Sequence, residues 1–427
     1  MFLRHPSVFA ATALMIIGLL MISLTLVPIA HAQPSVTATV IVGKAPYGVA
    51  YDPAKGEIFV VSYDADTVSV ISDSNNQVVA TISVGDSPAD IAYDSAKGEM
   101  FVSNTASDTV SVISDSSNSV VATVNVGADP RGVAYDPAQG EVFVSTSTSS
   151  TSGTVYEISD SNNAVVGTIG LPGAATGIAY DSGKGEIFVS TGGSFVSVVS
   201  APTGDIVASV TVPGLPRGIT YDPDNGDLYV SNYGTSANSV SVISDSSNAV
   251  VATVSVGPWP FYSAYDSALN EVYVGDSDSH MVSVISANNN TVVDTITAGE
   301  YPTAAAYDST TGEVFVTNFG INTVSIISGA GAPTATSTTN ATITSTTPLT
   351  TSSSMTVLSS STVSTAPPTS TSSSTSQASS TTTSATTSTA AGSVPEFPPS
   401  ILFASAVAIV AVAAYYLASR RWLPSLS

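Results

Sequence analysis

Seven of the eight Tyr-Asp dipeptides in this chain of 427 residues recur at nearly even spacing, the exception being Tyr63-Asp64. Successive tyrosines of these seven dipeptides lie 42, 42, 45, 41, 44 and 42 residues apart. Self-similarity with a period of about 20 to 50 residues indicates one supersecondary unit repeated so that neighbours bury a shared core. The chain is therefore expected to fold as seven equivalent units, marked by Tyr51, Tyr93, Tyr135, Tyr180, Tyr221, Tyr265 and Tyr307.

Each unit contains four short stretches rich in Val, Ile, Thr, Phe and Tyr. In the first unit they are a stretch ending in Tyr51-Asp52, then EIFVVS (57–62), TVSVIS (67–72) and VVATISVG (78–85), with turn-forming residues between them. Such stretches predict β-strands. One four-stranded antiparallel sheet every 40 to 45 residues is typical of a propeller blade. The sequence thus predicts an all-β fold, a seven-bladed β-propeller.

The two ends of the repeat region predict how the ring closes. The seventh unit runs into Gly329 without a fourth strand, whereas SVTATVIVG (35–43) precedes the first unit and has the pattern of a fourth strand. We expect this N-terminal strand to complete the last blade, which leaves no unpaired sheet edge at the closure.

The repeats carry a family resemblance. FVSN (101–104), YVSN (229–232) and FVTN (315–318), each followed by a VSVI-like strand, resemble YVTN-family β-propeller repeats, which occur in archaeal surface-layer proteins and bacterial periplasmic YncE-like proteins. The resemblance covers all seven repeats and implies the propeller fold. It does not imply a function, because propellers host binding, scaffolding and several enzyme chemistries.

The N-terminus resembles an export signal. Residues 1–32 have one basic residue, Arg4, then a long apolar run and the triplet Ala30-His31-Ala32. This pattern predicts a secretory signal peptide cleaved before Gln33, the alternative being an uncleaved anchor. The propeller, residues 33–330, would then lie outside the cell membrane.

The C-terminal quarter predicts a stalk and an anchor. Between residues 333 and 393, 41 of 61 residues are Ser or Thr and none is charged. This composition predicts that residues 331–393 are a disordered, O-glycosylated stalk, or else an unglycosylated flexible linker. Within residues 394–427, an apolar stretch (401–418) before Arg420-Arg421 predicts a single transmembrane helix with a cytoplasmic tail, or otherwise a buried helix. The preceding VPEFPPS (394–400) resembles an archaeal PEF-type sorting signal.

Charge and composition exclude several classes of function. The chain has 32 acidic and nine basic residues and no cysteine, so nucleic acid is not an expected partner and disulfides and thiolate chemistry are impossible. The only histidine after the signal peptide is His280, which we interpret as a loop residue. No catalytic residues and no cofactor are predicted. The loop around Asp276 and Asp278 offers oxygens to Ca²⁺ but lacks the ligand pattern of a dedicated site, so no metal site is predicted.

Alternating strand direction separates two faces of the ring. The Asp-Pro and Ser-Asp-Ser turns lie on one face, and the second loop of each blade and the links between blades lie on the other, here named the variable face. Acids repeated in every unit are interpreted as turn formers. The repeated acids are Asp52, Asp94, Asp136, Asp181, Asp222, Asp266 and Asp308, with Glu57, Glu99, Glu141, Glu186, Asp227, Glu271 and Glu313.

Departures from the repeat identify candidate binding residues on the variable face. Aromatic and Arg side chains are typical anchors of recognition surfaces, and they occur irregularly beside the first-strand proline and in the loops. The alternative is that the arginines only neutralise acids and the aromatics fill loops. No histidine and no single acid is expected at this mouth of the ring. The candidate ligand-binding residues are Tyr47, Arg131, Arg217, Tyr233, Trp259, Phe261 and Tyr301.

Two functions remain open from the sequence. The first is a non-enzymatic, membrane-anchored cell-surface module for binding, adhesion or envelope structure, with envelope glycans, surface proteins or a small extracellular ligand as partners. The second is an extracytoplasmic propeller enzyme of the lactonase, lyase or quinoprotein-like kind. Asn289 and Asn340 lie in Asn-X-Thr sequons and are predicted glycosylation sites.

Overall fold

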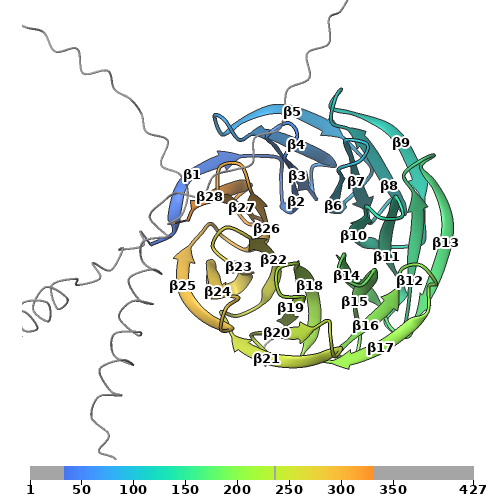
Figure 1. Cartoon of the computed structure of the whole chain (residues 1–427). Coiled ribbons are helices and arrows are strands. Elements are labelled where there is room, and N and C mark those ends of the chain that lie inside the picture. The colour runs from blue at the N-terminus through green and yellow to red at the C-terminus, as the bar shows by residue number, and fades with distance from the viewer. Residues whose placement is uncertain (1–32, 235–236, 330–427) are drawn as a thin grey trace, which may run out of the picture. The chain divides into compact units, whose positions relative to one another are not determined.

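The computed structural model describes residues 33–234 and 237–329, which form seven four-stranded antiparallel sheets arranged around a central axis (Figure 1). The all-β, seven-bladed propeller predicted from the repeats is thereby confirmed. Among the described residues no helix is long and apolar enough to cross a bilayer. The predicted signal peptide, stalk, sorting motif and transmembrane segment lie outside the described residues.

The four strands of a blade lie side by side, with the first strand nearest the axis and the fourth at the rim. The innermost strands are β2 (Pro46–Asp52), β6 (Pro88–Asp94), β10 (Pro130–Asp136), β14 (Ala175–Asp181), β18 (Leu215–Asp222), β22 (Pro260–Asp266) and β26 (Pro302–Asp308). The second strands are β3 (Glu57–Ser62), β7 (Glu99–Asn104), β11 (Glu141–Ser149), β15 (Glu186–Thr191), β19 (Asp227–Tyr233), β23 (Glu271–Asp276) and β27 (Glu313–Asn318). The third strands are β4 (Thr67–Ser72), β8 (Thr109–Ser114), β12 (Ser152–Ser159), β16 (Phe195–Ser200), β20 (Ser239–Ser244), β24 (Met281–Ser286) and β28 (Thr323–Ser328).

The outermost strands form the rim of the ring. They are β5 (Gln77–Ser83), β9 (Ser119–Asn125), β13 (Ala164–Leu171), β17 (Ile206–Thr211), β21 (Ala249–Ser255), β25 (Thr291–Thr297) and, for the seventh blade, β1 (Ser35–Ile41). Strand β1 pairs antiparallel with β28, from Ser35 opposite Ser328 to Ile41 opposite Thr323. The predicted closure of the ring by the N-terminal strand is thus confirmed.

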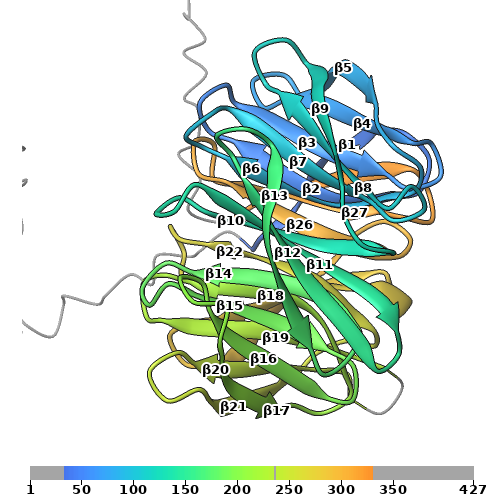
Figure 2. The same cartoon turned by 90° about the vertical axis from the view of Figure 1, so that its right-hand side faces the viewer.

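The core lies between the faces of neighbouring blades (Figure 2). Phe59 of the first blade packs with Ile91 and Met100 of the second, and all three side chains are buried. The third residue of every second strand is a fully buried aromatic ring, so each blade contributes one large side chain to its interface. These rings are Phe59, Phe101, Phe143, Phe188, Tyr229, Tyr273 and Phe315.

The repeated Tyr-Asp dipeptide joins one blade to the next. The Asp52 Oδ1 atom accepts hydrogen bonds from the backbone N–H groups of Ala54 (2.8 Å) and Lys55 (3.3 Å), which closes the turn after β2. Burial and the Asp52 carboxylate together raise the pKa of Tyr93, whose hydroxyl on the second blade lies beside that carboxylate. At the closure, the Tyr51 hydroxyl donates to Thr310 Oγ1 at 2.7 Å. The interpretation of these acids as structural is consistent with this arrangement.

Lysine and aspartate are matched between consecutive blades on the turn face. Lys55 of the first blade contacts Asp115 of the second, and Lys97 of the second contacts Asp160 of the third. Lys184 of the fourth blade donates to the backbone carbonyl of Asp245 in the fifth. Where the next blade has Ala or Gly in place of Asp, the lysine is absent as well, as the pairs Gln139/Ala201, Asn225/Ala287 and Leu269/Gly329 show. The closure is the exception, because Asp73 is present in the first blade while the seventh has Thr311 in place of lysine.

Candidate functional site

A β-bulge interrupts the inner strand of every blade on the variable side. In β2 the register passes from Pro46 opposite Ser62 to Val49 opposite Val60, so that Tyr47 and Gly48 together oppose Val61. Bulges redirect side chains and are common beside binding sites. The first bulge position is variable, and its residues are Tyr47, Ala89, Arg131, Thr176, Arg217, Phe261 and Thr303.

The second bulge position lies against the neighbouring blade and is glycine in four blades. A Cβ atom on Gly48 would lie 2.7 Å from the Ala89 carbonyl oxygen, and one on Gly132 would lie 2.6 Å from the Thr176 carbonyl oxygen. Neither approach leaves room for a side chain. The inner strands therefore come as close as their backbones permit, except in the blades with Asp90, Tyr262 and Ala304 at this position.

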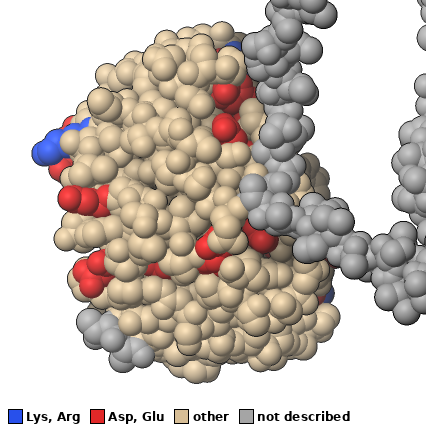
Figure 3. All heavy atoms as spheres, turned by 90° about the vertical axis from the view of Figure 1, so that its left-hand side faces the viewer, with Lys and Arg blue, Asp and Glu red and all other residues tan. Residues whose placement is uncertain are grey.

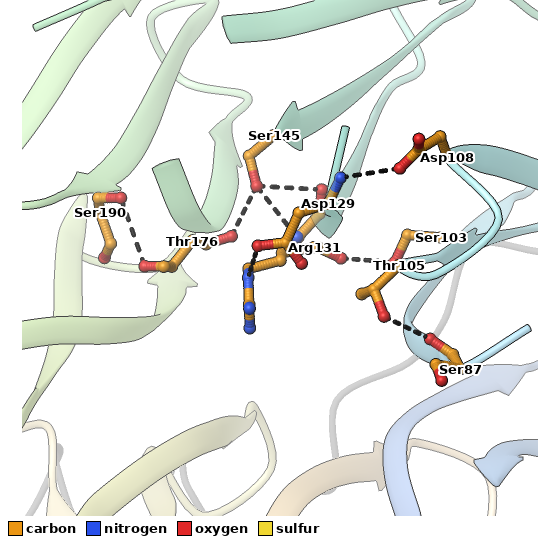
Figure 4. A network of polar contacts seen from close by, with 10 residues as sticks. Ser87, Ser103, Thr105, Asp108, Asp129, Arg131, Ser145, Thr176 and Ser190 are labelled. Carbon is orange, nitrogen blue, oxygen red and sulfur yellow. Dashed lines mark hydrogen bonds and ion pairs between the residues drawn. The ribbon is translucent and has the colours of Figure 1, made fainter. Parts of the chain in front are cut away.

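A hydroxyl on the second strand ties three of the bulges to the next blade, and those of Ser103 and Ser145 are drawn in Figure 4. Ser145 Oγ accepts the Gly132 N–H (2.9 Å) and donates to the Thr176 carbonyl (2.6 Å). Thr317 Oγ1 accepts the Ala304 N–H (2.9 Å) and donates to the Tyr47 carbonyl across the closure (2.8 Å). Ser103 likewise donates to the carbonyl of Arg131. These bonds fix the backbone that carries the variable side chains.

Aromatic side chains from four adjacent blades and the links between them converge on the variable face. Tyr47 makes edge-on contact with Phe261 at 5.5 Å between ring centroids and with Phe319 at 6.2 Å. Tyr233 lies 5.5 Å from Trp259 and 5.8 Å from Phe261. These rings enclose a cavity of about 250 Å³, here named the aromatic pocket, lined by Tyr47, Tyr233, Trp259, Phe261, Ser277, Tyr301, Thr303 and Phe319.

A second cavity of about 350 Å³ lies over the third to fifth blades and is more polar. Arg131 extends from β10 into the space beside the inner strands, with its Nε atom 2.9 Å from Asp129 Oδ2 (Figure 4). Hydroxyls and glycine backbone form the opposite wall. This arginine pocket is lined by Asp129, Arg131, Ser147, Ser150, Ala174, Thr176, Thr191, Gly192, Gly193, Leu215, Pro216 and Arg217.

Arg217 joins the two pockets. Its guanidinium carbon lies 5.1 Å from the ring centroid of Tyr233 and 5.8 Å from that of Phe261, within the range of cation–π attraction. The Nε atom is buried without a hydrogen-bond partner. Among the described residues Arg217 forms no ion pair, whereas Arg131 is paired with Asp129. The ring faces thus orient a guanidinium whose hydrogen-bonding capacity is not used.

Asp90 corrects the expectation that the mouth of the ring has no single acid. Its Oδ2 atom accepts the Val133 N–H at 3.1 Å, and burial raises the pKa of its carboxyl to about 6. The negative charge of Asp90 also contributes to raising the pKa of the Tyr47 and Tyr262 hydroxyls. Burial raises the pKa of Tyr47 to about 12, although Arg217 and Arg131 act in the opposite direction. A carboxyl, two phenols and two guanidinium groups therefore meet near the axis.

The structure brings the seven predicted ligand-site residues to these two adjoining cavities. Five line the aromatic pocket, namely Tyr47, Tyr233, Trp259, Phe261 and Tyr301, and two line the arginine pocket, namely Arg131 and Arg217. Their role in binding stays a prediction. Sequence reasoning missed Asp90, Tyr262, Phe319 and Tyr63, the last of which packs with its ring centroid 5.9 Å from that of Tyr47. A comparison of the second bulge position and of the residue after each second strand would have found all four, because each breaks its column of the repeat.

The remaining predicted residues lie apart from this cluster or at its edge. Asn289 is exposed in the turn between β24 and β25, as expected for a sequon, and Asn340 lies outside the described residues. His280 Nδ1 accepts the Tyr301 N–H at 3.2 Å, and the two rings meet edge-on at 5.2 Å. In the described part of the chain no group of three or more His, Asp or Glu residues is placed to hold a metal ion.

Fold and site together define a seven-bladed β-propeller whose candidate binding site lies on the variable face beside the axis. No family model matches the chain, and no curated protein matches it. Among solved structures 1708 chains are similar, too many for the fold to indicate one function. One is the hydrazine synthase of Kuenenia stuttgartiensis, with a TM-score of 0.60, 16% sequence identity and coverage of 71% of this chain and 98% of that chain. At this identity the likeness shows the fold alone.

Proposed function

We propose that this protein is a non-enzymatic binding module displayed outside the cell. A signal peptide at residues 1–32 exports the chain, the Ser/Thr-rich segment at 331–393 holds the propeller away from the membrane, and residues 401–418 anchor it. These assignments rest on composition and on the resemblance to YVTN-type surface proteins. The variable face then meets ligands in the surroundings of the cell.

The observation that carries the proposal is the convergence of aromatic side chains on one cavity. Ligand sites are concave and mostly apolar, with a few polar groups that set orientation. The aromatic pocket has six rings beside the hydroxyls of Ser277 and Thr303, with the Arg217 guanidinium over two of the rings. At about 250 Å³ it is smaller than the ~300–1,000 Å³ of drug-sized sites, so it fits a single ring such as one sugar unit.

The test is a screen of glycans and small molecules on residues 33–330. Trp259→Ala is expected to weaken binding about tenfold or more, because aromatic hot spots contribute about 2 kcal/mol. Phe195→Ala is the control, since Phe195 is 41% exposed at the start of β16 and outside both pockets. If the two variants bind every ligand equally well, the aromatic pocket is not the site.

An extracytoplasmic enzyme is the second candidate, and Asp90 is the observation in its favour. A carboxyl whose pKa is raised to about 6 by burial, with Tyr47 and Tyr262 close by, has the acid–base character that catalysis near neutral pH requires. Any ligand found in the screen is therefore incubated with the protein and analysed for turnover. Product formed by the wild type and not by Asp90→Asn would favour the enzyme.

A further inference from the structure

We infer that the ligand of the variable face is an acidic glycan, with a uronate carboxylate between Arg131 and Arg217 and a neighbouring sugar ring in the aromatic pocket. This inference rests on the proposed function and specifies its ligand. It follows from the position of the two cavities on either side of Arg217, and from the hydrogen-bonding groups that this arginine and Arg131 leave free.

The first step concerns the unused donors. Arg217 makes no ion pair among the described residues, and because its Nε atom is buried, its terminal amino groups are the donors available to a ligand. Arg131 reaches Asp129 through Nε, which leaves its terminal amino groups for a ligand. Guanidinium groups bind carboxylates through two parallel hydrogen bonds. Two arginines lining one cavity are thus arranged for an oxyanion.

The second step concerns the charge of that oxyanion. Asp129 already neutralises Arg131 through their 2.9 Å ion pair, and the Asp90 carboxylate accepts the N–H of Val133, two residues further along β10. The propeller as a whole has 31 acidic residues and six basic ones, so it repels multiply charged anions. The residual positive charge suits one negative charge, which favours a carboxylate over a phosphate group.

The third step concerns the rest of the ligand. Ser147, Thr176 and Thr191 line the arginine pocket, and Ser277 and Thr303 line the aromatic pocket. Except for Ser147, these hydroxyls already donate to backbone carbonyls, so towards a ligand they act as acceptors. Hydroxyls beside aromatic rings complement a sugar, which has polar edges and an apolar ring face. Two adjoining cavities accept two linked rings better than one small acid. An oligosaccharide with a uronate unit satisfies both cavities.

The experiment compares an aldobiouronic acid, a disaccharide of one uronate and one neutral sugar, with its methyl ester, in which the single carboxylate charge is removed. Binding to the full-length chain in detergent is measured by calorimetry. The wild type is expected to bind the acid at least about tenfold more tightly than the ester, as a lost bidentate contact to charge implies. Arg217→Gln and Arg131→Gln should each reduce this preference severalfold, and added salt should reduce it as well.

The matched control is Lys44→Gln. Lys44 is an exposed cation in the link before β2, paired with Asp64 at 3.2 Å and outside both pockets. Lys44→Gln removes the same charge as Arg217→Gln, so a general electrostatic effect would reduce the preference for the acid equally in both variants. Unchanged melting temperatures show that the variants are folded. If Arg217→Gln does not fold, Arg131→Gln tests the inference in its place.

The outcomes separate the inference from the proposed function. Equal binding of acid and ester, with both weakened by Trp259→Ala, overturns the anionic ligand and leaves the binding pocket standing. Binding of benzoate as tight as that of the oligosaccharide overturns the glycan in favour of a small carboxylic acid. If neither oligosaccharide binds the wild type, the acidic-glycan inference is wrong, and the broader screen with Trp259→Ala then decides the proposed function separately.

Discussion

Single substitutions at otherwise repeated positions distinguish one blade from another. The sixth residue of the second strand is Asn in three blades, where its amide donates to hydroxyls on or beside the third strand, as Asn104 does to Thr109 and Ser111. In the sixth blade it is Asp276, which is fully buried and accepts the Ser283 hydroxyl at 2.6 Å. Burial raises the pKa of Asp276 to about 6. An ionisable carboxyl thus occupies, in the sixth blade, the position that an asparagine amide occupies in three other blades.

We therefore predict that Asp276→Asn stabilises the propeller at neutral pH. Because the folded-state pKa of about 6 exceeds the ordinary value of 3.8, folding retains the proton, and the stability this provides is lost as the pH rises from about 4 to above 6. The variant does not titrate, so its gain should be on the order of 2 kcal/mol at pH 8 and nearly absent at pH 4. Chemical denaturation at both pH values measures it.

The contradicting result would be an equal effect of Asp276→Asn at the two pH values. Asn318→Asp is the reciprocal control, since Asn318 donates to Thr323 and Ser325 in the same place in the seventh blade. It should destabilise the protein at pH 8 more than at pH 4.

At the scale of strands, the stability of the ring depends on the contacts between each blade and the next. The hydroxyls of Ser103, Ser145 and Thr317 join consecutive blades at the bulges. In the first blade this position holds Val61, which has no hydroxyl. Ser190 and Ser231 occupy it in the fourth and fifth blades, but their Oγ atoms are buried without a hydrogen-bond partner. The hydroxyl therefore links consecutive blades at only some of the described interfaces.

Thr317→Val is expected to weaken the interface at the closure. Valine has nearly the shape of threonine, so the change removes the hydroxyl and leaves the Ala304 N–H and the Tyr47 carbonyl without this partner. Leaving buried polar groups unpaired costs about 1–3 kcal/mol. Thermal or urea unfolding measures the loss, with Val61→Thr as the control that adds a hydroxyl in the first blade. A loss no larger than that of the control would show that the bond contributes little.

Removal of β1 should open the ring. Deleting residues 35–43 exposes the edge of β28 and the buried face of the seventh blade, so the melting temperature should fall markedly. A synthetic peptide with the sequence SVTATVIVG should restore it in proportion to the peptide concentration, as any ligand of the folded state does. Melting that is unchanged by the deletion would contradict closure by this strand.

Strand order and closure were predictable because the seven repeats, and the one fourth strand displaced to the N-terminus, can be counted in the sequence. The site was predictable only in part. Tyr47 and Phe261 stood out because they vary beside a repeated proline. Tyr63 and Phe319 were missed because only the strand register brings them near such a proline. Pro46 lies opposite Ser62, the residue before Tyr63, and Pro302 lies opposite Asn318, the residue before Phe319. The contact of Arg217 with Tyr233 joins side chains from different strands and depends on side-chain geometry that a repeat pattern does not contain.

At the scale of the molecule, the propeller is acidic but sparsely charged. Figure 3 shows acidic side chains in separate groups on a surface formed mainly by uncharged residues. Only 10% of the chain is charged, so uncharged polar side chains have to provide much of its polar surface. The outer strands also carry exposed valines, such as Val79 at 51% and Val121 at 52%, beside a bulge in each strand that blunts edge pairing.

We predict that the native protein is glycosylated. Asn289 is exposed in a turn, and the segment between residues 333 and 393 has 41 Ser or Thr residues. Intact-mass measurement of protein from its natural source should exceed the polypeptide mass, and enzymatic or chemical deglycosylation should remove the excess. Asn289→Gln is expected to remove only the contribution of that site. A native mass equal to that of the bare polypeptide would rule out the glycosylated stalk.

The matching of lysine and aspartate between consecutive blades makes the blades non-interchangeable. Lys55 has Asp115 as its partner in the next blade, whereas Leu269 lies beside Gly329, where a Cβ atom would come within 2.9 Å of the leucine Cδ1 atom and the leucine would have to shift. A copy of the first blade inserted before the seventh would bring an unpaired lysine, and the reverse exchange would isolate an acid. After an ancestral duplication, neighbouring blades would therefore have to diverge in pairs, and recombination between distant repeats would be selected against despite their similar sequences.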